Sequence, residues 1–161
     1  MLGKGDQLPI FELLDEEEHI ISSEDLLGQS LVIYFYPKDE TPGCTKEACA
    51  FRDSFDDFEA LGARIIGISS DSPETHLEFK KSYNLPFTLL SDPQNTARKA
   101  FGVKGELFGL VPGRVTFVIN ADGKILSAFS SQLQINKHVD IALEVLNAEV
   151  EEPQKNVLVG Y

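Results

Sequence analysis

The chain contains two cysteines, Cys44 and Cys49, five positions apart. Residues 31–36 before them read LVIYFY, an apolar run typical of a buried strand. Thr41 and Pro42 then form a typical helix start, because threonine can cap the first turn and proline fits the first helical position. Cys44 is thus predicted at the third position of a helix, where the helix dipole favours a thiolate. The predicted chemistry is attack by a sulfur nucleophile.

The helical phase separates the two cysteines. Cys49 is rotated from Cys44 by roughly 140° around the predicted helix, and five residues place their Cα atoms roughly 8–9 Å apart. A disulfide needs Cα atoms within about 7 Å of each other. The two thiols can therefore bond only if the first helical turns unwind, which suits a transient bond better than a structural one. Apolar residues follow Cys44 on the same helix face: Ala48, Phe51, Phe55 and Phe58.

Other interpretations of the cysteines stay open at this point. Cys49 could be a small packing residue, which is a common role for a cysteine in a helix. A zinc site would need further ligands at suitable spacing, and His19, His76 and His138 are scattered, so no metal is predicted. We expect His76 to be a solvent-facing helix residue. A thioredoxin-like dithiol would have two intervening residues rather than the four found here.

The composition limits the class of protein. At 161 residues the chain is expected to form one domain. Its net charge is −12 and its basic residues are not clustered, which argues against nucleic acid or an anionic membrane as a partner. No apolar run approaches the roughly 20 residues that span a bilayer. The N-terminal residues do not resemble a signal or transit peptide, and two cysteines suit a reducing compartment. We predict a cytoplasmic protein, and a mature organellar form stays open.

Strand and helix patterns alternate along the chain and predict an α/β fold with a mixed sheet flanked by helices. Strands are expected at residues 31–36, 64–69, 87–90, 115–119 and 124–129, and residues 10–14 and 19–22 are expected to form an N-terminal β-hairpin. Three helices are expected to begin at Thr41-Pro42, Ser72-Pro73 and Asp92-Pro93, and a fourth to cover residues 136–147. We expect a domain of residues 1–148 and a loosely held acidic tail of residues 149–161.

The residues around the cysteines resemble the active-site signature of the peroxiredoxins. Pro37, Thr41 and Cys44 have the spacing of that signature, and it continues as TPGCT-x-E-A-C through Cys49. The second cysteine five positions on resembles the Q type, also called bacterioferritin comigratory proteins. The similarity extends through residues 69–72, 85–92 and 112–119, and the version at residues 107–114 resembles the plant and cyanobacterial branch.

This resemblance implies a thioredoxin-like fold and the reduction of hydrogen peroxide and organic hydroperoxides. Cys44 would be the peroxidatic cysteine and Cys49 the resolving one, joined in an intramolecular disulfide that thioredoxin or a similar dithiol reduces. Thr41 and Arg114 would orient the peroxide and stabilise the thiolate, and Pro37 would shield the site. We expect Arg114 to be partly exposed at a strand end. The resemblance implies no metal, haem, flavin or nucleotide cofactor, and a monomer.

Two other functions would also use this cysteine pair. In a redox sensor, the disulfide would change the shape of the protein and signal to a partner. A protein disulfide oxidoreductase would act on protein thiols and leave peroxide untouched. Turnover separates these functions, because an enzyme cycles with excess reductant whereas a sensor switches once.

Overall fold

The structure is a computed structural model that describes residues 1–105 and 111–159, with side chains through Glu151. Within this part of the chain, seven strands form one mixed sheet in the order β2-β1-β5-β4-β3-β6-β7. The strands are β1 (Glu12–Asp15), β2 (Ile20–Ser22), β3 (Ser30–Phe35), β4 (Ala63–Ser69), β5 (Thr88–Ser91), β6 (Val115–Ile119) and β7 (Ile125–Ser130). The expected N-terminal hairpin is confirmed as β1 and β2, which pair antiparallel.

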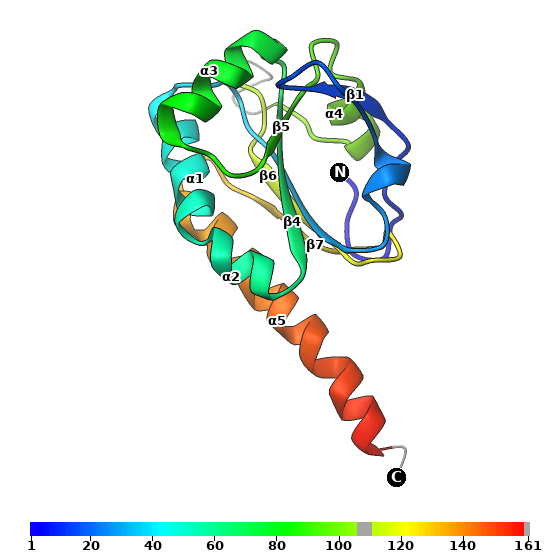
Figure 1. The fold of residues 1–161 in the computed structure, drawn as a ribbon. Coiled ribbons are helices and arrows are strands. Elements are labelled where there is room, and N and C mark those ends of the chain that lie inside the picture. Colours follow the sequence, from blue (N-terminus) through cyan, green and yellow to red (C-terminus); the bar gives the residue numbers. More distant parts are fainter. Residues whose placement is uncertain (106–110, 160–161) are drawn as a thin grey trace.

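The helices cover both faces of this sheet (Figure 1). They are η1 (Ser23–Leu26), α1 (Pro42–Asp53), α2 (Phe55–Ala60), α3 (Pro73–Tyr83), α4 (Thr96–Phe101) and α5 (Ile135–Val159). In Figure 1, α1, α2, α3 and α5 lie on one side of the sheet, and α4 lies on the other side with the N-terminal segment. The expected α/β architecture with flanking helices is confirmed.

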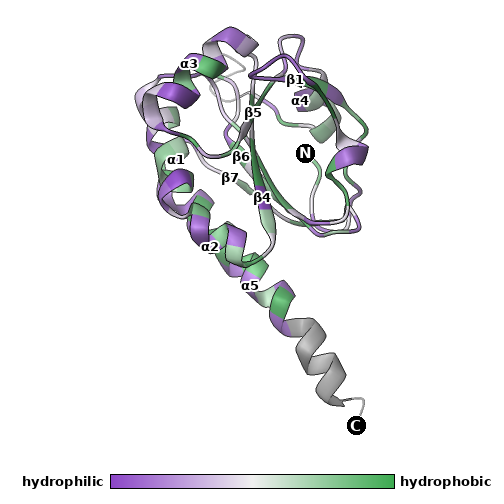
Figure 2. Ribbon diagram, in the orientation of Figure 1, coloured by the Kyte–Doolittle hydropathy of each residue, from purple (hydrophilic) through white to green (hydrophobic). Residues whose placement is uncertain are grey.

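The interior strand β3 faces a hydrophobic core on each side. Leu31, Ile33 and Phe35 contribute to the core under α4 and the N-terminal segment. Val32 and Tyr34 contribute to the core under α1, α2, α3 and α5. A strand buried on both faces reads as a continuous apolar run, which is why the sequence shows no alternation here. Figure 2 shows these hydrophobic strands between helices whose outer faces are hydrophilic.

The neighbours of β3 bring distant segments of the chain together. β3 pairs parallel with β4 and antiparallel with β6, and the antiparallel register ends with Phe35 opposite Val115. The carboxyl end of β3 therefore lies beside the start of β6. The segment that leads to Cys44 and the segment that contains Arg114 meet at this edge of the sheet.

The expected third helix start at Asp92-Pro93 is wrong. Helix α4 begins at Thr96, with Asn95 as its N-cap. The carboxylate of Asp92 nevertheless accepts hydrogen bonds from the backbone N–H groups of Ala97 (3.2 Å) and Arg98 (3.0 Å). Asp92 thus satisfies free donors of the first turn although it lies three residues before the N-cap, Asn95.

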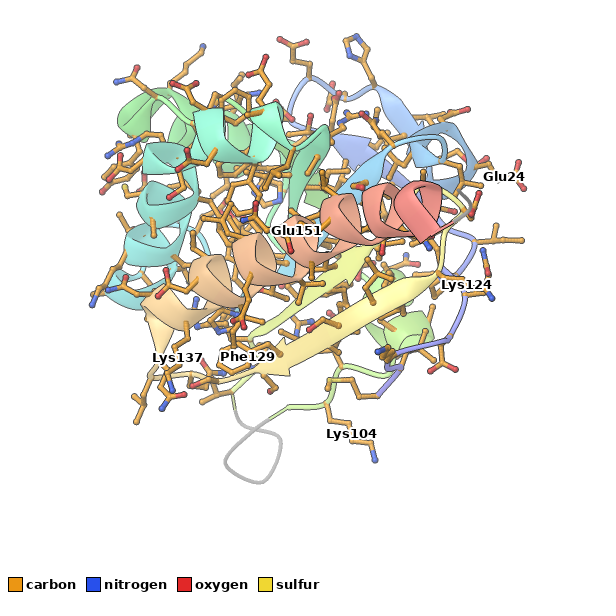
Figure 3. The ribbon with its side chains drawn as sticks, turned by 90° about the horizontal axis from the view of Figure 1, so that it is seen from below. Glu24, Lys104, Lys124, Phe129, Lys137 and Glu151 are labelled. Atoms are coloured by element: carbon orange, nitrogen blue, oxygen red, sulfur yellow. The ribbon has the colours of Figure 1, made fainter. Side chains whose placement is uncertain are left out.

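The last helix is longer than expected. α5 continues to Val159, past the predicted end at residue 147 and through the expected tail. It lies across β6 and β7 in Figure 3, where Phe129 of β7 and Lys137 of α5 are labelled close to each other. The division of the chain after residue 148 stays a prediction, and residues 160–161 lie outside the described residues. Among the described helices, none is both long and apolar enough to cross a membrane.

Candidate active site

Cys44 occupies the third position of α1, as the sequence predicts. Thr41 is the N-cap, Pro42 begins the helix, and the Thr45 N–H donates to the Thr41 carbonyl at 2.9 Å. The Cys44 side chain is only 1% exposed and belongs to the core under α1. Its thiol is a free thiol beside the N-terminus of the helix, where backbone N–H groups and the helix dipole favour negative charge.

Arg114 contacts this thiol directly. Its Nη2 donates to Cys44 Sγ at 3.3 Å, and its Nη1 donates to Glu47 Oε1 at 2.9 Å. Gly43 allows this approach, since a Cβ there would lie 3.1 Å from Arg114 Nη2. Arg114 is only 4% exposed, so our expectation of a partly exposed arginine is wrong. Burial favours a lower pKa for Arg114, but the acidic groups of Glu47 and Cys44 raise that pKa above its ordinary value.

Glu47 carries a buried carboxyl group behind Arg114. It lies one turn after Cys44 on α1, and its side chain is fully buried. Its Oε2 lies 3.5 Å from Nδ1 of His138, a fully buried side chain of α5. Burial raises the pKa of Glu47 to about 7, although Arg114 opposes this shift. Glu47 thus connects the cation beside Cys44 with a histidine from the opposite end of the chain.

The hydrogen bonds of His138 define its tautomer. Nε2 lies 2.8 Å from the Ser131 carbonyl, which only accepts, so Nε2 carries a proton. Nδ1 then presents a lone pair in the neutral ring and accepts from the Thr116 hydroxyl at 2.8 Å. Burial lowers the pKa of His138 to about 4, which favours this neutral ring.

The second carboxyl oxygen of Glu47 faces the unprotonated nitrogen of this ring. Oε2 is buried, and no residue in the described part of the chain forms a hydrogen bond with it. It faces the lone pair of His138 Nδ1, so two acceptors oppose each other while Glu47 is ionised. A proton on Oε2 removes this repulsion, in agreement with the raised pKa of Glu47. When it is protonated, Glu47 no longer neutralises Arg114, and the full cation faces the Cys44 sulfur.

Thr41 and Pro37 lie on the loop between β3 and α1. The Thr41 hydroxyl donates to the Lys38 carbonyl at 2.8 Å rather than capping the helix, so its expected capping bond is absent. Its oxygen can still accept a hydrogen bond from a ligand. Pro37 is half-buried and follows Tyr36, whose N–H donates to Ile68 of β4 at 3.1 Å. The sheet therefore holds the backbone that leads directly into Pro37.

Asp39 fixes this loop through hydrogen bonds with three other residues. Its carboxylate accepts from the Tyr36 hydroxyl at 2.5 Å and lies 2.6 Å from Nδ1 of His76 in α3, and its N–H donates to Asp71 at 2.8 Å. His76 is fully buried, and its Nε2 contacts the Leu90 carbonyl at 3.0 Å. The expectation that His76 faces solvent is therefore wrong. Asp39, Asp71 and His76 lie close enough to share a metal ion, but each already bonds to protein groups.

Cys49 lies on the same helix and is half-buried, and its thiol is free. Cys44 and Cys49 both belong to the regular part of α1, so the helix keeps the two sulfur atoms on different faces. Arg114, Cys44 and Thr41 thus gather at the start of α1, whereas Cys49 lies more than one turn further along.

Most of the chain is similar in sequence to known proteins. The model of the AhpC/TSA family matches residues 4–128. A chloroplastic peroxiredoxin Q of Sedum lineare is 49% identical over 145 residues, which cover 90% of this chain and 78% of that protein. The chain belongs to the AhpC/TSA family.

Further relatives and solved structures place it among the Q-type peroxiredoxins. The chloroplastic peroxiredoxin Q of Arabidopsis thaliana is 47% identical over 147 residues, covering 91% of this chain and 68% of that protein. A crystal structure of a peroxidoxin from Mycobacterium tuberculosis has a TM-score of 0.85 and 39% identity, covering 92% and 98% of the two chains. A peroxiredoxin Q from Xanthomonas campestris has a TM-score of 0.80 and 32% identity, covering 88% and 96%. The predicted thioredoxin-like fold is confirmed, and this Q-type peroxiredoxin is a thiol peroxidase.

Several residues near the thiol were not singled out from the sequence. Glu47 carries a visible signal, because a charged residue interrupts the inward-facing stripe one turn after Cys44. His138 interrupts the apolar face of α5 in the same way. Asp39 has no comparable signal, since an acidic residue in a loop is usually exposed. Residues 107–110 of the branch-specific motif lie outside the described residues.

Opposite pKa shifts at Glu47 and His138 predict two opposite pH dependences. Folding raises the pKa of Glu47 from 4.5 to about 7, so the folded state binds more protons there and loses stability as the pH rises through this window. Folding lowers the pKa of His138 from 6.5 to about 4, so its contribution to stability is lost as the pH falls. Relative to the wild type, Glu47→Gln should lose stability as the pH falls from 7 to 4.5. His138→Gln should gain stability as the pH falls from 6.5 to 4.5.

Urea unfolding of the three proteins at a series of pH values measures both effects. One fully displaced proton changes the free energy of unfolding by at most about 1.4 kcal/mol per pH unit. Parallel stability curves for the wild type and both variants would show that neither group changes its pKa on folding.

Proposed function

We propose that Cys44 is the peroxidatic cysteine and Cys49 the resolving cysteine of this peroxidase. The observation that supports this most directly is the 3.3 Å contact between Arg114 Nη2 and Cys44 Sγ, at the N-terminus of α1. A guanidinium and a helix N-terminus both stabilise a thiolate, which is the nucleophilic form of cysteine. In the part of the chain that the structure describes, no guanidinium forms a hydrogen bond with Cys49, which is the eighth residue of α1 and lies away from its N-terminus.

In the first step, the Cys44 thiolate attacks one oxygen of the peroxide and the O–O bond breaks. A sulfur–oxygen bond forms, and the leaving oxygen takes the electron pair of the broken bond. It also takes, through solvent, the proton that the Cys44 thiol released on ionisation, and so becomes water or an alcohol. Cys44 is oxidised to sulfenic acid while the peroxide is reduced. Arg114 can donate to the oxygen on which charge develops, and Thr41 can accept from the peroxide hydroxyl. Pro37 is proposed to shield this space from water.

In the second step, the Cys49 thiol condenses with the sulfenic acid, and water leaves as the disulfide forms. An intact α1 holds the two Cα atoms roughly 8–9 Å apart, beyond the reach of a disulfide. The helix must therefore unwind from its N-terminus between the two steps. We propose thioredoxin or a similar dithiol as the reductant of this disulfide.

The enzyme is proposed to act as a monomer in a reducing compartment. A pair of cysteines within one chain completes the cycle without a second subunit, which supports a monomer. The substrates are hydrogen peroxide and organic hydroperoxides, and the reaction uses no cofactor. Reduction of the disulfide requires a reducing compartment, so we propose a cytoplasmic protein or a mature organellar form.

Turnover with a physiological reductant tests the proposed function. NADPH consumption is followed with peroxide, thioredoxin and thioredoxin reductase, and it should continue until the peroxide is exhausted. If only one NADPH is oxidised per protein molecule, the protein is a redox sensor instead. Activity on a scrambled disulfide-bonded protein without loss of peroxide would indicate a disulfide oxidoreductase.

Cysteine variants should separate the two steps. Cys44→Ser should abolish peroxide consumption, because a serine hydroxyl is not ionised at neutral pH. Cys49→Ser should keep the first step and accumulate sulfenic acid, detected by mass spectrometry after dimedone trapping. The Cys49→Ser protein should also be inactivated more easily at high peroxide, since over-oxidation then has no competitor. A Cys44→Ser protein that retains a tenth of the wild-type rate would refute the assignment.

Arg114→Ala should slow the first step by about 10²-fold or more, comparable to the loss of an oxyanion donor. Because Glu47 would lose its buried partner, we also expect a loss of stability of about 3–5 kcal/mol. The double variant Arg114→Ala, Glu47→Gln should recover much of this stability and none of the rate. If the double variant recovers the rate as well, Arg114 serves folding rather than chemistry. Stopped-flow kinetics and urea unfolding measure the two quantities.

Amide hydrogen exchange should reveal the unwinding of α1. Formation of the disulfide should sharply increase exchange across residues 41–52, whereas β3 and β6 stay protected inside the sheet. The control is Cys49→Ser treated with the same peroxide, in which α1 has no reason to open. An oxidised wild-type protein with unchanged protection from Pro42 onward would mean that another chain or an external thiol resolves Cys44.

A further inference from the structure

Arg98 lies in α4, on the opposite face of the sheet from Cys44, yet its side chain reaches the edge where the active site forms. It is buried, with 8% exposure. Its Nη1 donates to the Gly113 carbonyl at 2.8 Å, and its Nη2 donates to the Tyr36 carbonyl at 3.1 Å. These carbonyls belong to the residues that directly precede Arg114 and Pro37. A single guanidinium therefore joins the two segments that carry the proposed catalytic residues.

The sheet itself does not hold these two segments together. The paired part of β3 and β6 ends with Phe35 opposite Val115, so Tyr36 and Gly113 lie just past the ladder. Pro37 has no N–H with which to extend the pairing. The planar guanidinium supplies two donors in a fixed geometry at this point. Arg98 thus joins the Tyr36 and Gly113 segments beyond the point where backbone hydrogen bonds pair β3 with β6.

Arg98 is itself held firmly in place. Its N–H donates to Asp92 Oδ2 at 3.0 Å, and the N–H of Asp92 donates to the Ser69 carbonyl of β4 at 2.8 Å. Its guanidinium lies over the ring of Phe35, 5.5 Å from the centroid. These contacts fix the backbone of Arg98 to β4 and its charged end to β3. Because both ends of this residue are restrained, it can hold the Pro37 and Arg114 segments at fixed positions relative to the sheet.

The segment after α4 also contacts Gly113. A Cβ on Gly113 would lie 2.4 Å from the Lys104 carbonyl oxygen, a distance that only glycine tolerates. The backbone before Arg114 is therefore pressed against residues that follow α4, in addition to its bond with Arg98. α4 and its flanking residues support the Arg114 segment from the far side of the sheet.

We propose that Arg98 is a positioning residue of the peroxidase reaction. By binding the carbonyls of Tyr36 and Gly113, it sets the separation between the Pro37 loop and the Arg114 guanidinium, and hence the geometry in which the peroxide is held. This inference rests on the proposed roles of Pro37 and Arg114. Donors that stabilise a transition state must be placed to within about 0.5 Å, so a small change in this separation affects the rate.

The decisive variant is Arg98→Lys, which keeps the positive charge but replaces the planar pair of donors with one ammonium group. The rate of the first step with hydrogen peroxide is compared with the rate of alkylation of Cys44 by iodoacetamide, both as functions of pH in the Cys49→Ser background. Alkylation needs the thiolate alone, whereas the peroxide reaction also needs the surrounding donors. We expect the peroxide rate to fall by about tenfold or more, and the alkylation rate and its pH profile to change by less than about threefold.

Lys99→Met is the matched control, because Lys99 is an exposed basic residue on the same short helix. It should leave both rates unchanged. Arg98→Met should lower the peroxide rate further than Arg98→Lys. If Arg98→Met does not fold, the comparison with Arg98→Lys still decides the proposal.

Two results would overturn the role of Arg98. A peroxide rate for Arg98→Lys within twofold of the wild type would show that the bridge is dispensable. Equal losses in the peroxide and alkylation rates would show that Arg98 affects only the thiolate or the fold. Neither result would contradict the proposed function. The proposed function fails only if the wild-type protein does not consume peroxide.

Discussion

The buried charge of Arg114 is the interaction on which the rest of the site depends. A guanidinium removed from water is costly unless acidic partners surround it, and Cys44 and Glu47 are those partners. The cation therefore favours the thiolate for the same reason that the thiolate favours the cation. Glu47 competes with Cys44 for this charge, and burial limits the competition by raising the pKa of Glu47 to about 7. A fully ionised carboxylate at Glu47 would leave less of the cation available to the sulfur.

The position of Arg114 follows from the topology of the sheet. Because β3 and β6 are antiparallel neighbours, the end of one strand lies beside the beginning of the other. One strand leads into the Pro37 loop and the first turn of α1, and the other begins directly after Arg114. Residues about 70 positions apart in the chain thus meet at one edge, as the Cys44–Arg114 contact shows. The contacts of Arg98 and Asp39 with this edge show that both faces of the sheet support it.

The sequence predicts the parts of this arrangement that depend on local pattern. The apolar run of β3 and the Thr41-Pro42 helix start place Cys44 correctly, because strand burial and N-terminal proline are local effects. The start of α4 is mispredicted, since the carboxylate of Asp92 binds the N–H groups of residues five and six positions further along the chain. His76 and Arg114 are mispredicted as exposed for a different reason. Each is a polar residue buried by a partner distant in sequence, Asp39 or Glu47. The local pattern shows that Glu47 faces inward, but it does not show that Arg114 is its partner, and Asp39 has no local signal at all.

The features that activate Cys44 oppose the step that must follow. A regular first turn of α1 directs N–H groups and the helix dipole at the sulfur, but it also keeps Cys49 out of reach. The contacts of the flanking residues suggest how far the helix can open without disturbing the domain. On one side, Asp39 is bonded to Tyr36, His76 and Asp71, which fixes the chain just before Thr41. On the other side, Phe51 is fully buried and stacks on Tyr34 of β3 with ring centroids 4.6 Å apart. Between these two anchors, the residues from Thr41 to Ala50 hold both cysteines, and we infer that unwinding is confined to this segment. The sheet, Arg98 and the hydrogen bonds of Asp39 then stay in place, so the site can re-form as soon as the disulfide is reduced.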